Sequence, residues 1–372
     1  MKIALVHDYL IEAGGAERVL RVLSDMYPEA PIYTALAKKN GSAYITLQEC
    51  DIRESKWAWF LKIGRFYSYF RFFLPWIWQS IDLTDYDLII TSSSGYIARG
   101  FKVRPDAKVV CYCHTPPRWL YGYDTPTGAD KKWWGQAFMW VVGPFMRYFD
   151  YQSAQRVNVW IANSKEVAGR ISKFYRKEAV VVYPPIEVKY SSTAVQQFSS
   201  DKSARLENWK TGKRENEYYL MISRIVGGKG IMEASQAFKK LGITLKIIGE
   251  VVDTRLGEKV ESVGRVDDAE LTDLYSHARG FVALSRDEDF GMTVVESMAY
   301  GTPVLAFNGG GYKETVIPGE TGILIDGTDV ASIGGGIKQM EKIKWDREAI
   351  MKWARRFGRV RFEKEIRKVV GV

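Results

Sequence analysis

The sequence predicts an α/β protein with two Rossmann-like domains that face each other across a cleft. Two observations lead to this prediction. A short apolar strand, a glycine turn and an amphipathic helix open the chain within residues 2–27, and a second series of strands and helices starts at residue 218. Such alternation is typical of parallel sheets covered by helices. The length of 372 residues also fits two domains of ordinary size.

The first series of elements follows from apolar runs that end at polar or glycine residues. The predicted strands are Lys2–Val6, Leu88–Thr91, Lys108–Tyr112, Trp160–Ala162 and Val180–Tyr183. Apolar residues at helical spacing predict a helix over Ala16–Tyr27, and Asn163-Ser164 is expected to cap another. The series ends at Pro184-Pro185, because proline does not continue regular structure.

The second series follows a polar segment at residues 187–217, which we expect to be a linker or a surface excursion. The predicted strands are Tyr218–Ile222, Thr244–Ile248, Gly280–Leu284 and Pro303–Ala306. The predicted helices are Ile231–Leu241, Ala269–His277 and Val294–Ala299, with a basic closing helix at 346–368. Ligands of such sheets bind beyond the carboxyl ends of the strands, so the cleft is the expected site.

The charge of the chain is concentrated in its first half. The net charge is +9, of which residues 1–180 carry +7 (24 basic and 17 acidic groups) and residues 181–372 carry +2 (29 and 27). This excess suggests an anionic partner: a membrane, a nucleic acid or a phosphorylated ligand. Three cysteines make no disulfide framework, and no apolar run is long enough to span a membrane. We expect a cytoplasmic protein, either soluble or peripheral.

Aromatic and basic residues gather in the stretch 56–81, which has 11 aromatic residues, four basic residues and no acid. This composition suits a membrane interface. The candidate membrane residues are Trp57, Trp59, Lys62, Arg65, Arg71, Trp76 and Trp78. The stretch 131–151 repeats the pattern more weakly. The alternatives are a pair of aromatic core helices or base stacking, although no nucleic-acid-binding module is present.

Two glycine-containing segments could bind phosphate. Gly14-Gly15 lies at the start of a helix, where free backbone amides favour an anion, and a plain turn is the alternative. Arg224 ends a strand and Lys229 precedes a helix, so the two cations could hold a diphosphate and stabilise it as a leaving group. A solvated loop with ordinary surface charges is the alternative. Neither segment matches a G-x-G-x-x-G or Walker A motif.

Three further side chains could bind the hydroxyls of a sugar or ribose. Glu288 and Glu296 lie eight residues apart around a helix start, and paired hydroxyls are commonly held by a carboxylate. His114 follows a strand and could donate to a hydroxyl or carbonyl. The alternatives are acidic residues that favour a helix N-terminus and a structural histidine. The D-x-D pattern at Asp85 and Asp87 is interpreted as the start of a strand, so no metal site is predicted.

In order and spacing, these segments resemble the family 4 retaining glycosyltransferases, which have the GT-B fold. The resemblance covers nearly the whole chain and includes Glu288-Asp289-Phe290-Gly291, which matches the E-x-F-G element. Three segments look like a bacterial and archaeal mannosyltransferase branch that uses GDP-mannose: His7-Asp8-Tyr9-Leu10, Gly14-Gly15-Ala16-Glu17-Arg18 and Cys113-His114-Thr115-Pro116-Pro117-Arg118-Trp119-Leu120-Tyr121. The closing helix looks like one that crosses back to the first domain. The expected domains are 1–186 with about 346–372, which binds the acceptor, and 187–345, which binds the donor.

The resemblance implies a role for each candidate residue. His114, Arg224, Lys229 and Glu288 would be catalytic. The implied donor-binding set is Gly14, Gly15, Arg224, Lys229, Gly264, Arg265, Val266, Glu288, Phe290, Gly291, Met292, Thr293 and Glu296. Within it the two cations would bind the diphosphate, Glu296 the ribose, Glu288 the transferred sugar and 264–266 the base. Asp8, Tyr9 and Arg118 are weaker candidates for acceptor binding.

The implied reaction is the retaining, metal-independent transfer of a hexose. The donor would be GDP-mannose or another nucleotide sugar, no cofactor would be required, and the acceptor would be a lipid-linked glycan or glycolipid. We expect the protein to lie on the inner face of the cell membrane and to bind no nucleic acid. The alternatives are a transferase of the same fold that uses a UDP-sugar, a nucleotide-sugar 2-epimerase, and a membrane-docked subunit that has lost catalysis.

Overall fold

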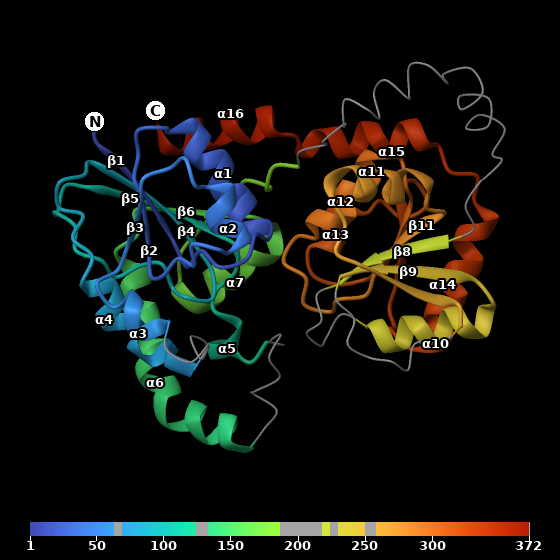
Figure 1. Ribbon diagram of the computed structural model, residues 1–372, viewed down its shortest axis with the longest axis horizontal. Coiled ribbons are helices and arrows are strands. Elements are labelled where there is room, and N and C mark those ends of the chain that lie inside the picture. The colour runs from blue at the N-terminus through green and yellow to red at the C-terminus, as the bar shows by residue number, and fades with distance from the viewer. Residues whose placement is uncertain (63–68, 124–132, 187–217, 224–229, 250–257, 372) are drawn as a thin grey trace. The chain divides into compact units, whose positions relative to one another are not determined.

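The chain forms two compact units in a computed structural model that describes residues 1–62, 69–123, 133–186, 218–223, 230–249 and 258–371 (Figure 1). Unit 1 comprises Met1–Pro185 together with Arg359–Val372, and unit 2 comprises Ile186–Gly358. The two units are therefore joined by two crossings of the chain, because unit 2 is inserted before the last segment of unit 1.

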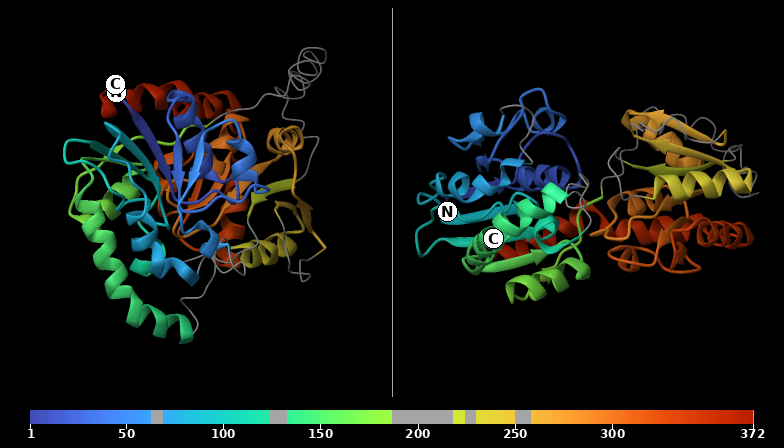
Figure 2. Two further views of the ribbon diagram at one scale, coloured as in Figure 1. Left: turned by 60° about the vertical axis from the view of Figure 1, so that its left-hand side comes forward. Right: turned by 90° about the horizontal axis from the view of Figure 1, so that it is seen from below.

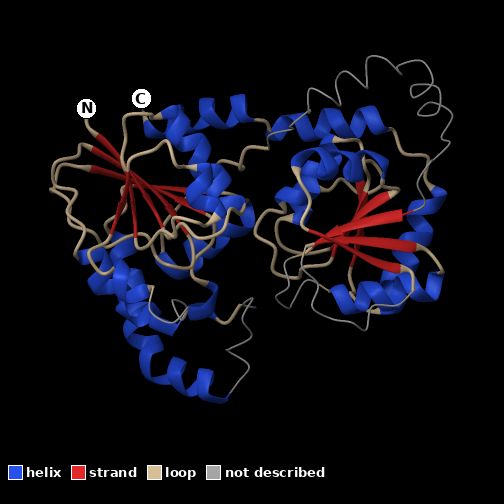
Figure 3. Ribbon diagram, in the orientation of Figure 1, coloured by secondary structure: helices blue, strands red, loops and turns tan. Residues whose placement is uncertain are grey.

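Unit 1 is built on a parallel sheet with the strand order β3-β2-β1-β4-β5-β6-β7 (Figure 3). Its strands are β1 (Ile3–His7), β2 (Ile32–Thr34), β3 (Ile52–Glu54), β4 (Leu88–Ser93), β5 (Lys108–Cys113), β6 (Val159–Ala162) and β7 (Val180–Val181). Alternate residues of β1 enter two different apolar cores, with Ala4 and Val6 in one and Leu5 in the other. Both faces of the sheet are thus covered, as parallel sheets require.

The helices of unit 1 surround this sheet. They are α1 (Gly15–Met26), α2 (Ser42–Thr46), α3 (Ala58–Leu61), α4 (Leu74–Gln79), α5 (Arg118–Tyr121), α6 (Trp133–Gln155), α7 (Lys165–Tyr175) and α16 (Arg359–Val370), with a 3-10 turn at Tyr69–Phe73. Ser164 caps α7 as predicted, since its Oγ accepts a hydrogen bond from the amide of Val167 at 3.1 Å. Asp87 directly precedes β4 and accepts a hydrogen bond from the amide of Lys2 at 2.6 Å, which confirms a strand start there.

Unit 2 contains a second parallel sheet with the strand order β10-β9-β8-β11-β12-β13. Its strands are β8 (Tyr218–Ile222), β9 (Thr244–Ile248), β10 (Val260–Gly264), β11 (Gly280–Ala283), β12 (Val304–Phe307) and β13 (Gly322–Ile325). Its helices are α10 (Ile231–Leu241), α11 (Asp268–His277), α12 (Met292–Ala299), α13 (Tyr312–Thr315), α14 (Val330–Lys342) and α15 (Arg347–Ala354), and a 3-10 turn follows at Arg355–Phe357. The predicted strands β8 and β9 and helix α10 have the expected bounds.

Each sheet has a switch point, at which the order in which successive strands are added to the sheet reverses. In unit 1 this point lies between β1 and β4, and in unit 2 it lies between β8 and β11. The connections from the two central strands leave toward opposite sides, so a crevice opens beyond their carboxyl ends. The prediction of two Rossmann-like folds is confirmed, and the two switch points are the places to look for ligand-binding residues.

The predicted closing helix is wrong as a single element. It is divided into α15, a 3-10 turn and α16, and Gly358 between them has an extended backbone (φ −72°, ψ 162°). The buried residues of α15 are Ile350 and Ala354, which belong to unit 2, whereas α16 belongs to unit 1. The basic composition that suggested one continuous helix gives no signal at this break.

Several described residues of the aromatic segment at 56–81 belong to the core of unit 1. Trp78 is fully buried, and its indole donates a hydrogen bond to the carbonyl of Tyr96 at 2.7 Å. The Arg71 guanidinium lies 5.4 Å from the ring centroid of Trp119, and Lys62 pairs with Glu54 at 2.7 Å. The membrane prediction is therefore wrong for Trp78. Other members, Trp57, Trp59 and Trp76, are 45%, 61% and 50% exposed, and Arg65 lies outside the described residues.

The stretch 131–151, where the aromatic and basic pattern is weaker, contains the more exposed aromatic side chains. Helix α6 lies beside α3 and α4 in unit 1 and extends past them (Figures 1 and 2). Its exposed large apolar residues are Trp133, Trp140, Val141, Phe145, Tyr148 and Tyr151. At 3.6 residues per turn, these positions fall along one side of the helix. We call these six residues the outer stripe of α6.

Candidate active site

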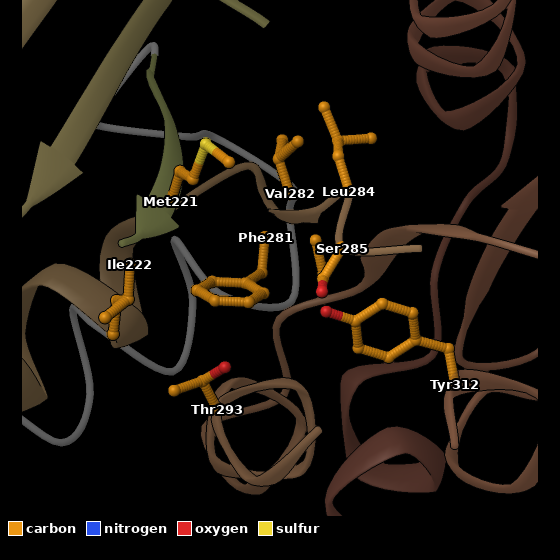
Figure 4. Close-up of a pocket in the computed structure, with 9 residues that line it drawn as sticks. Met221, Ile222, Phe281, Val282, Leu284, Ser285, Thr293 and Tyr312 are labelled. Carbon is orange, nitrogen blue, oxygen red and sulfur yellow. The ribbon is translucent and has the colours of Figure 1, made fainter. Parts of the chain in front are cut away.

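A pocket lies at the switch point of unit 2, between β8 and β11 and the first turn of α12 (Figure 4). It is lined by Met221, Ile222, Phe281, Val282, Ala283, Leu284, Ser285, Thr293 and Tyr312. The hydroxyl of Tyr312 points toward that of Ser285 at one side of the pocket (Figure 4). Its lining combines apolar side chains with the hydroxyls of Ser285, Thr293 and Tyr312.

The loop that carries Glu288 runs from β11 to α12 beside this pocket. It packs against the glycine triplet Gly309–Gly311, whose Gly311 amide donates a hydrogen bond to the carbonyl of Glu288 at 2.9 Å. A Cβ on Gly311 would overlap the Cα of Phe290 and lie 2.5 Å from the carbonyl oxygen of Asp289. Only glycine therefore permits the two loops to approach so closely. The triplet fixes the backbone from which the half-buried Glu288 side chain extends.

Residues 290–293 lead into the first turn of α12. Phe290 is buried with its ring centroid 5.6 Å from that of Phe357, and it anchors the loop in the core of unit 2. Gly291 takes the left-handed conformation (φ 88°), and a Cβ there would lie 2.7 Å from the ring of Tyr312. The half-buried Met292 and Thr293 then open the helix, whose free amides favour an anion.

Glu296 lies one turn farther along α12 and is buried. Its Oε2 accepts a hydrogen bond from the hydroxyl of Tyr275 at 3.2 Å. The predicted pair of glutamates thus occupies two different environments: Glu288 on a half-buried loop, and Glu296 within the helix. The ring of Tyr275 stacks on that of Tyr300 with centroids 5.5 Å apart, which holds the partner of Glu296 in place.

The other predicted donor residues follow two strands of the same sheet. Gly264 is the last residue of β10, has φ 80°, and its carbonyl accepts the amide of Gly249 at 2.8 Å. Arg265 is exposed and Val266 is half-buried directly after it. Since all strands are parallel, these residues share the carboxyl edge with Glu288. Arg224 and Lys229 follow β8 in sequence but lie outside the described residues.

In unit 1, Gly14 and Gly15 follow β1 at the switch point. Gly14 is the N-cap of α1, and its amide donates to Oε2 of Glu17 at 2.8 Å. The Gly14 amide, which we expected to be available to a phosphate, is therefore already hydrogen-bonded to Glu17. Gly15 begins the helix itself.

His114 is joined to three other buried side chains at the same edge of the sheet. Its Nε2 lies 2.8 Å from Oγ of Ser92, that Oγ lies 3.0 Å from Nδ1 of His7, and Nε2 of His7 lies 3.5 Å from Oε1 of Glu17. We call Glu17, His7, Ser92 and His114 the buried relay. Burial, with a smaller contribution from nearby His7, lowers the pKa of His114 to about 3, so this ring is neutral at ordinary pH.

The three candidate acceptor residues have different environments. Asp8 is buried and binds the loop after β4: it accepts hydrogen bonds from the amides of Ser94, Tyr96 and Ala98 at 2.8–3.0 Å and from the Ser94 hydroxyl. This geometry gives Asp8 a positioning role instead of contact with an acceptor. Tyr9 is half-buried against the ring of Tyr96, and Arg118 is half-buried in the first turn of α5.

Sequence reasoning missed several residues of these two edges. His7, Glu17 and Ser92 were not identified as site residues, and neither were Ser285 and Tyr312. His7 ends β1 and is in register with Ser92, the second-last residue of the adjacent strand β4. The signal available was a polar residue at the end of an apolar strand, but strand neighbours 85 residues apart cannot be paired from periodicity alone.

Within the described residues, no group of three histidine, cysteine, aspartate or glutamate side chains is arranged to hold a metal ion. Over the same residues, no helix is both long and apolar enough to cross a bilayer.

Comparison with known proteins agrees with this architecture. Residues 13–190 match the model of Glycosyltransferase Family 4, and residues 204–357 match that of Glycosyl transferases group 1. Neither description is that of an epimerase, so the epimerase alternative receives no support. The structure is similar over the full length of both chains to Anabaena Alr3699/HepE in complex with UDP, with a TM-score of 0.68 and 18% identity.

Among curated proteins, the chain is 32% identical over 146 residues to a glycogen synthase of Mycobacterium tuberculosis (strain ATCC 25618 / H37Rv), covering 35% of this chain and 34% of the relative. It is 24% identical over 278 residues to the alpha-1,3/1,6-mannosyltransferase ALG2 of Candida glabrata, covering 63% and 57%. The matched region spans a third to somewhat over a half of these relatives. With both domains matched and both sheets in place, the chain belongs to the family 4 glycosyltransferases of the GT-B fold.

Proposed function

We propose that this glycosyltransferase moves mannose from GDP-mannose to a hydroxyl of a lipid-linked or glycan acceptor. The observation that carries the proposal is the edge of unit 2 at its switch point, where a pocket lined in part by hydroxyl groups adjoins the Glu288 loop and the start of α12. A helix start suits phosphate, and carboxylates suit sugar and ribose hydroxyls. Glu288 would bind the transferred sugar and Glu296 the ribose, with 264–266 beside the base.

The proposed chemistry is electrostatic. Arg224 and Lys229 would neutralise the diphosphate as the bond to the sugar breaks, so no metal ion or other cofactor would be needed. The acceptor hydroxyl would attack from the face that the diphosphate leaves, and the leaving phosphate would take its proton, which retains the anomeric configuration. Gly15 would lie beside the diphosphate, and His114 would contact a hydroxyl of the transferred sugar. These roles rest on the family resemblance.

Mannose is proposed because the ALG2 relative is named a mannosyltransferase. A second candidate donor is a UDP-sugar, because the similar HepE structures hold UDP and UDP-glucose. The two candidates share the diphosphate and differ in the base and the hexose, so one binding experiment separates them.

The donor is tested by thermal unfolding with a panel of GDP- and UDP-sugars, followed by transfer assays. We expect GDP-mannose to raise the melting temperature most and to support transfer. The change Arg224→Ala should lower transfer about 10²–10³-fold, the effect of removing one key electrostatic group. A larger shift with UDP-glucose would replace the proposed donor, and normal transfer by the Arg224 variant would remove the proposed diphosphate site.

The same assay tests the mechanism. Proton NMR of the product should show the anomeric configuration of the donor, and a chelator of divalent metals should leave the rate unchanged. An inverted product or a trapped covalent glycosyl-enzyme would exclude the same-face attack. Loss of transfer on chelation that a divalent metal restores would exclude the metal-independent proposal.

We also propose that unit 1 docks on the inner face of the cell membrane, with the outer stripe of α6 as its main contact. Trp133, Trp140 and Tyr148 are 80%, 83% and 65% exposed, an unusual cost for a helix that faces only water. The single acid of α6, Asp150, is fully buried against Arg99, so the exposed side presents no negative charge. Trp and Tyr beside basic residues suit the interface of an anionic bilayer.

Vesicle sedimentation tests the membrane contact. We expect vesicles with anionic lipid to recruit the protein more strongly than neutral ones, and less at high salt. The double change Trp133→Ser/Trp140→Ser should reduce recruitment at least tenfold, because it removes two large interfacial anchors. The matched control is Trp57→Ser/Trp59→Ser, which changes two exposed tryptophans of the segment at 56–81. If both double variants lose vesicle binding equally, the segment at 56–81 contacts the membrane as much as α6 does. If the Trp133→Ser/Trp140→Ser variant binds vesicles normally, the outer stripe of α6 is not a membrane contact.

A further inference from the structure

The buried relay joins four elements of unit 1 through side chains alone. Glu17 is on α1, His7 ends β1, Ser92 is on β4 and His114 follows β5. All four residues are at most 9% exposed. Within the described residues, the structure has no hydrogen bond to Nδ1 of His114, so the relay ends at this atom. The family resemblance assigned a role to His114 and none to the other three.

At the Glu17 end of the buried relay, the geometry determines which atom donates and which accepts each hydrogen bond. Oε2 of Glu17 accepts the amide of Gly14 at 2.8 Å, and Oε1 faces Nε2 of His7. Burial raises the pKa of Glu17, but its hydrogen bond with His7 and its hydrogen bonds with backbone amides outweigh this effect, so the net pKa is below the ordinary value. Glu17 is therefore ionised. A carboxylate can only accept hydrogen bonds, so Nε2 of His7 must carry a proton.

This direction passes along the relay. In a neutral His7 ring with its proton on Nε2, Nδ1 is an acceptor, so Ser92 must donate its hydroxyl proton to it. The Ser92 oxygen then accepts from Nε2 of His114 at 2.8 Å. A neutral imidazole has one N–H, which leaves Nδ1 of His114 without a proton.

We propose that Glu17, His7 and Ser92 are positioning residues that hold the proton of His114 on Nε2 and so present Nδ1 as a hydrogen-bond acceptor. The ligand it fits is a sugar hydroxyl that donates, and this last clause rests on the proposed function. A histidine that presented N–H instead would select a different set of hydrogen-bonding groups.

The change Glu17→Gln should exchange donor and acceptor in each hydrogen bond of the buried relay. The Gly14 amide donates to one side-chain atom of residue 17, so the glutamine carbonyl oxygen must face Gly14 and its NH₂ must face His7. His7 then accepts at Nε2 and carries its proton on Nδ1, Ser92 accepts from it and donates to Nε2 of His114, and the His114 proton moves to Nδ1. A nearly isosteric change thus alters an atom three hydrogen bonds away.

Long-range proton–nitrogen NMR spectra of protein labelled with ¹⁵N-histidine test this. The chain has three histidines, and His277 in unit 2 serves as an internal reference. In the wild type we expect the His114 proton on Nε2, and in Glu17→Gln on Nδ1, with His277 unchanged. In the Ser92→Ala background, Glu17→Gln should have no effect on His114, because the connection is cut.

A wild-type His114 with its proton on Nδ1 would overturn the proposal whether or not any variant folds. So would a Glu17→Gln protein that melts normally and keeps the proton on Nε2. These spectra are recorded without substrate, so they stand apart from the donor experiment.

Donor analogues test the ligand. Replacing the contacted sugar hydroxyl by hydrogen or by fluorine should raise KM about tenfold in both cases, the effect of one hydrogen bond, because fluorine cannot donate to Nδ1. In Glu17→Gln the fluorinated donor should bind better than the deoxy donor, since Nδ1–H can donate to fluorine. If neither analogue at any hydroxyl changes KM in the wild type, the contact between His114 and the sugar is excluded.

Discussion

At the scale of single residues, the glycine triplet 309–311 sets the position of the Glu288 loop. Gly311 has φ −66°, which alanine adopts freely, so only the overlap of its Cβ with the 289–290 backbone excludes a side chain. We expect Gly311→Ala to destabilise unit 2 by about 1–3 kcal/mol, the usual cost of overpacking. Displacement of the Glu288 loop should lower kcat/KM about 10²-fold, as expected for a misplacement near 1 Å.

The matched control for this prediction is Gly335→Ala in α14. A Cβ there meets nothing within 4 Å, and the position is exposed in a helix interior. Alanine should therefore stabilise the protein by up to about 1 kcal/mol and leave kinetics unchanged. Chemical denaturation and steady-state kinetics check both variants. Normal kinetics in Gly311→Ala would show that the triplet does not position the loop.

At the scale of elements, α16 supplies part of the core of unit 1. Phe362, Ile366 and Val370 are buried at a spacing of four residues, and the ring centroid of Phe362 lies 5.7 Å from that of Tyr112 on β5. Truncating a fully buried phenylalanine leaves a cavity, so Phe362→Ala should cost about 3–5 kcal/mol. The loss should appear in the unfolding of unit 1 and leave that of unit 2 in place.

Val360→Ala is the control on the same helix, because Val360 is 83% exposed and should change stability by less than about 0.5 kcal/mol. Calorimetry that resolves two transitions is the measurement. A shift of both transitions in Phe362→Ala would mean that the units unfold together, and no shift would mean that α16 does not stabilise unit 1.

The elements also show where sequence patterns were sufficient. Strand β8 is a continuous apolar run that ends at Ser223, and β9 ends in an apolar pair before Gly249; the bounds of both strands were predicted. The aromatic segment at 56–81 misled because its aromatic residues follow no regular period, and a pattern without periodicity cannot separate a core from a membrane surface. Helix α6 has the same ambiguity, which burial resolves: its outer stripe is exposed, and Met146 is in the core.

At the scale of the whole molecule, the fold was predictable because both halves repeat one strand–helix alternation. The edge residues of unit 2 were predictable in part, since Gly264 ends β10 and Glu288 lies in the loop that follows β11. The buried relay was not, because its members are 85, 22 and 10 residues apart along the chain and meet only through strand order. Short strands such as β2 and β3, with three residues each, also lack enough length for a periodic signal.

The division of unit 1 between the two ends of the described chain has a consequence for biosynthesis. The ribosome makes all of unit 2 before it makes α16, and a domain usually folds as soon as its own residues have emerged. We therefore expect unit 2 to reach its native state first, while the nascent unit 1 still exposes the groove that receives Phe362. The order of synthesis is thus the reverse of the order of completion: the half that is translated first matures last.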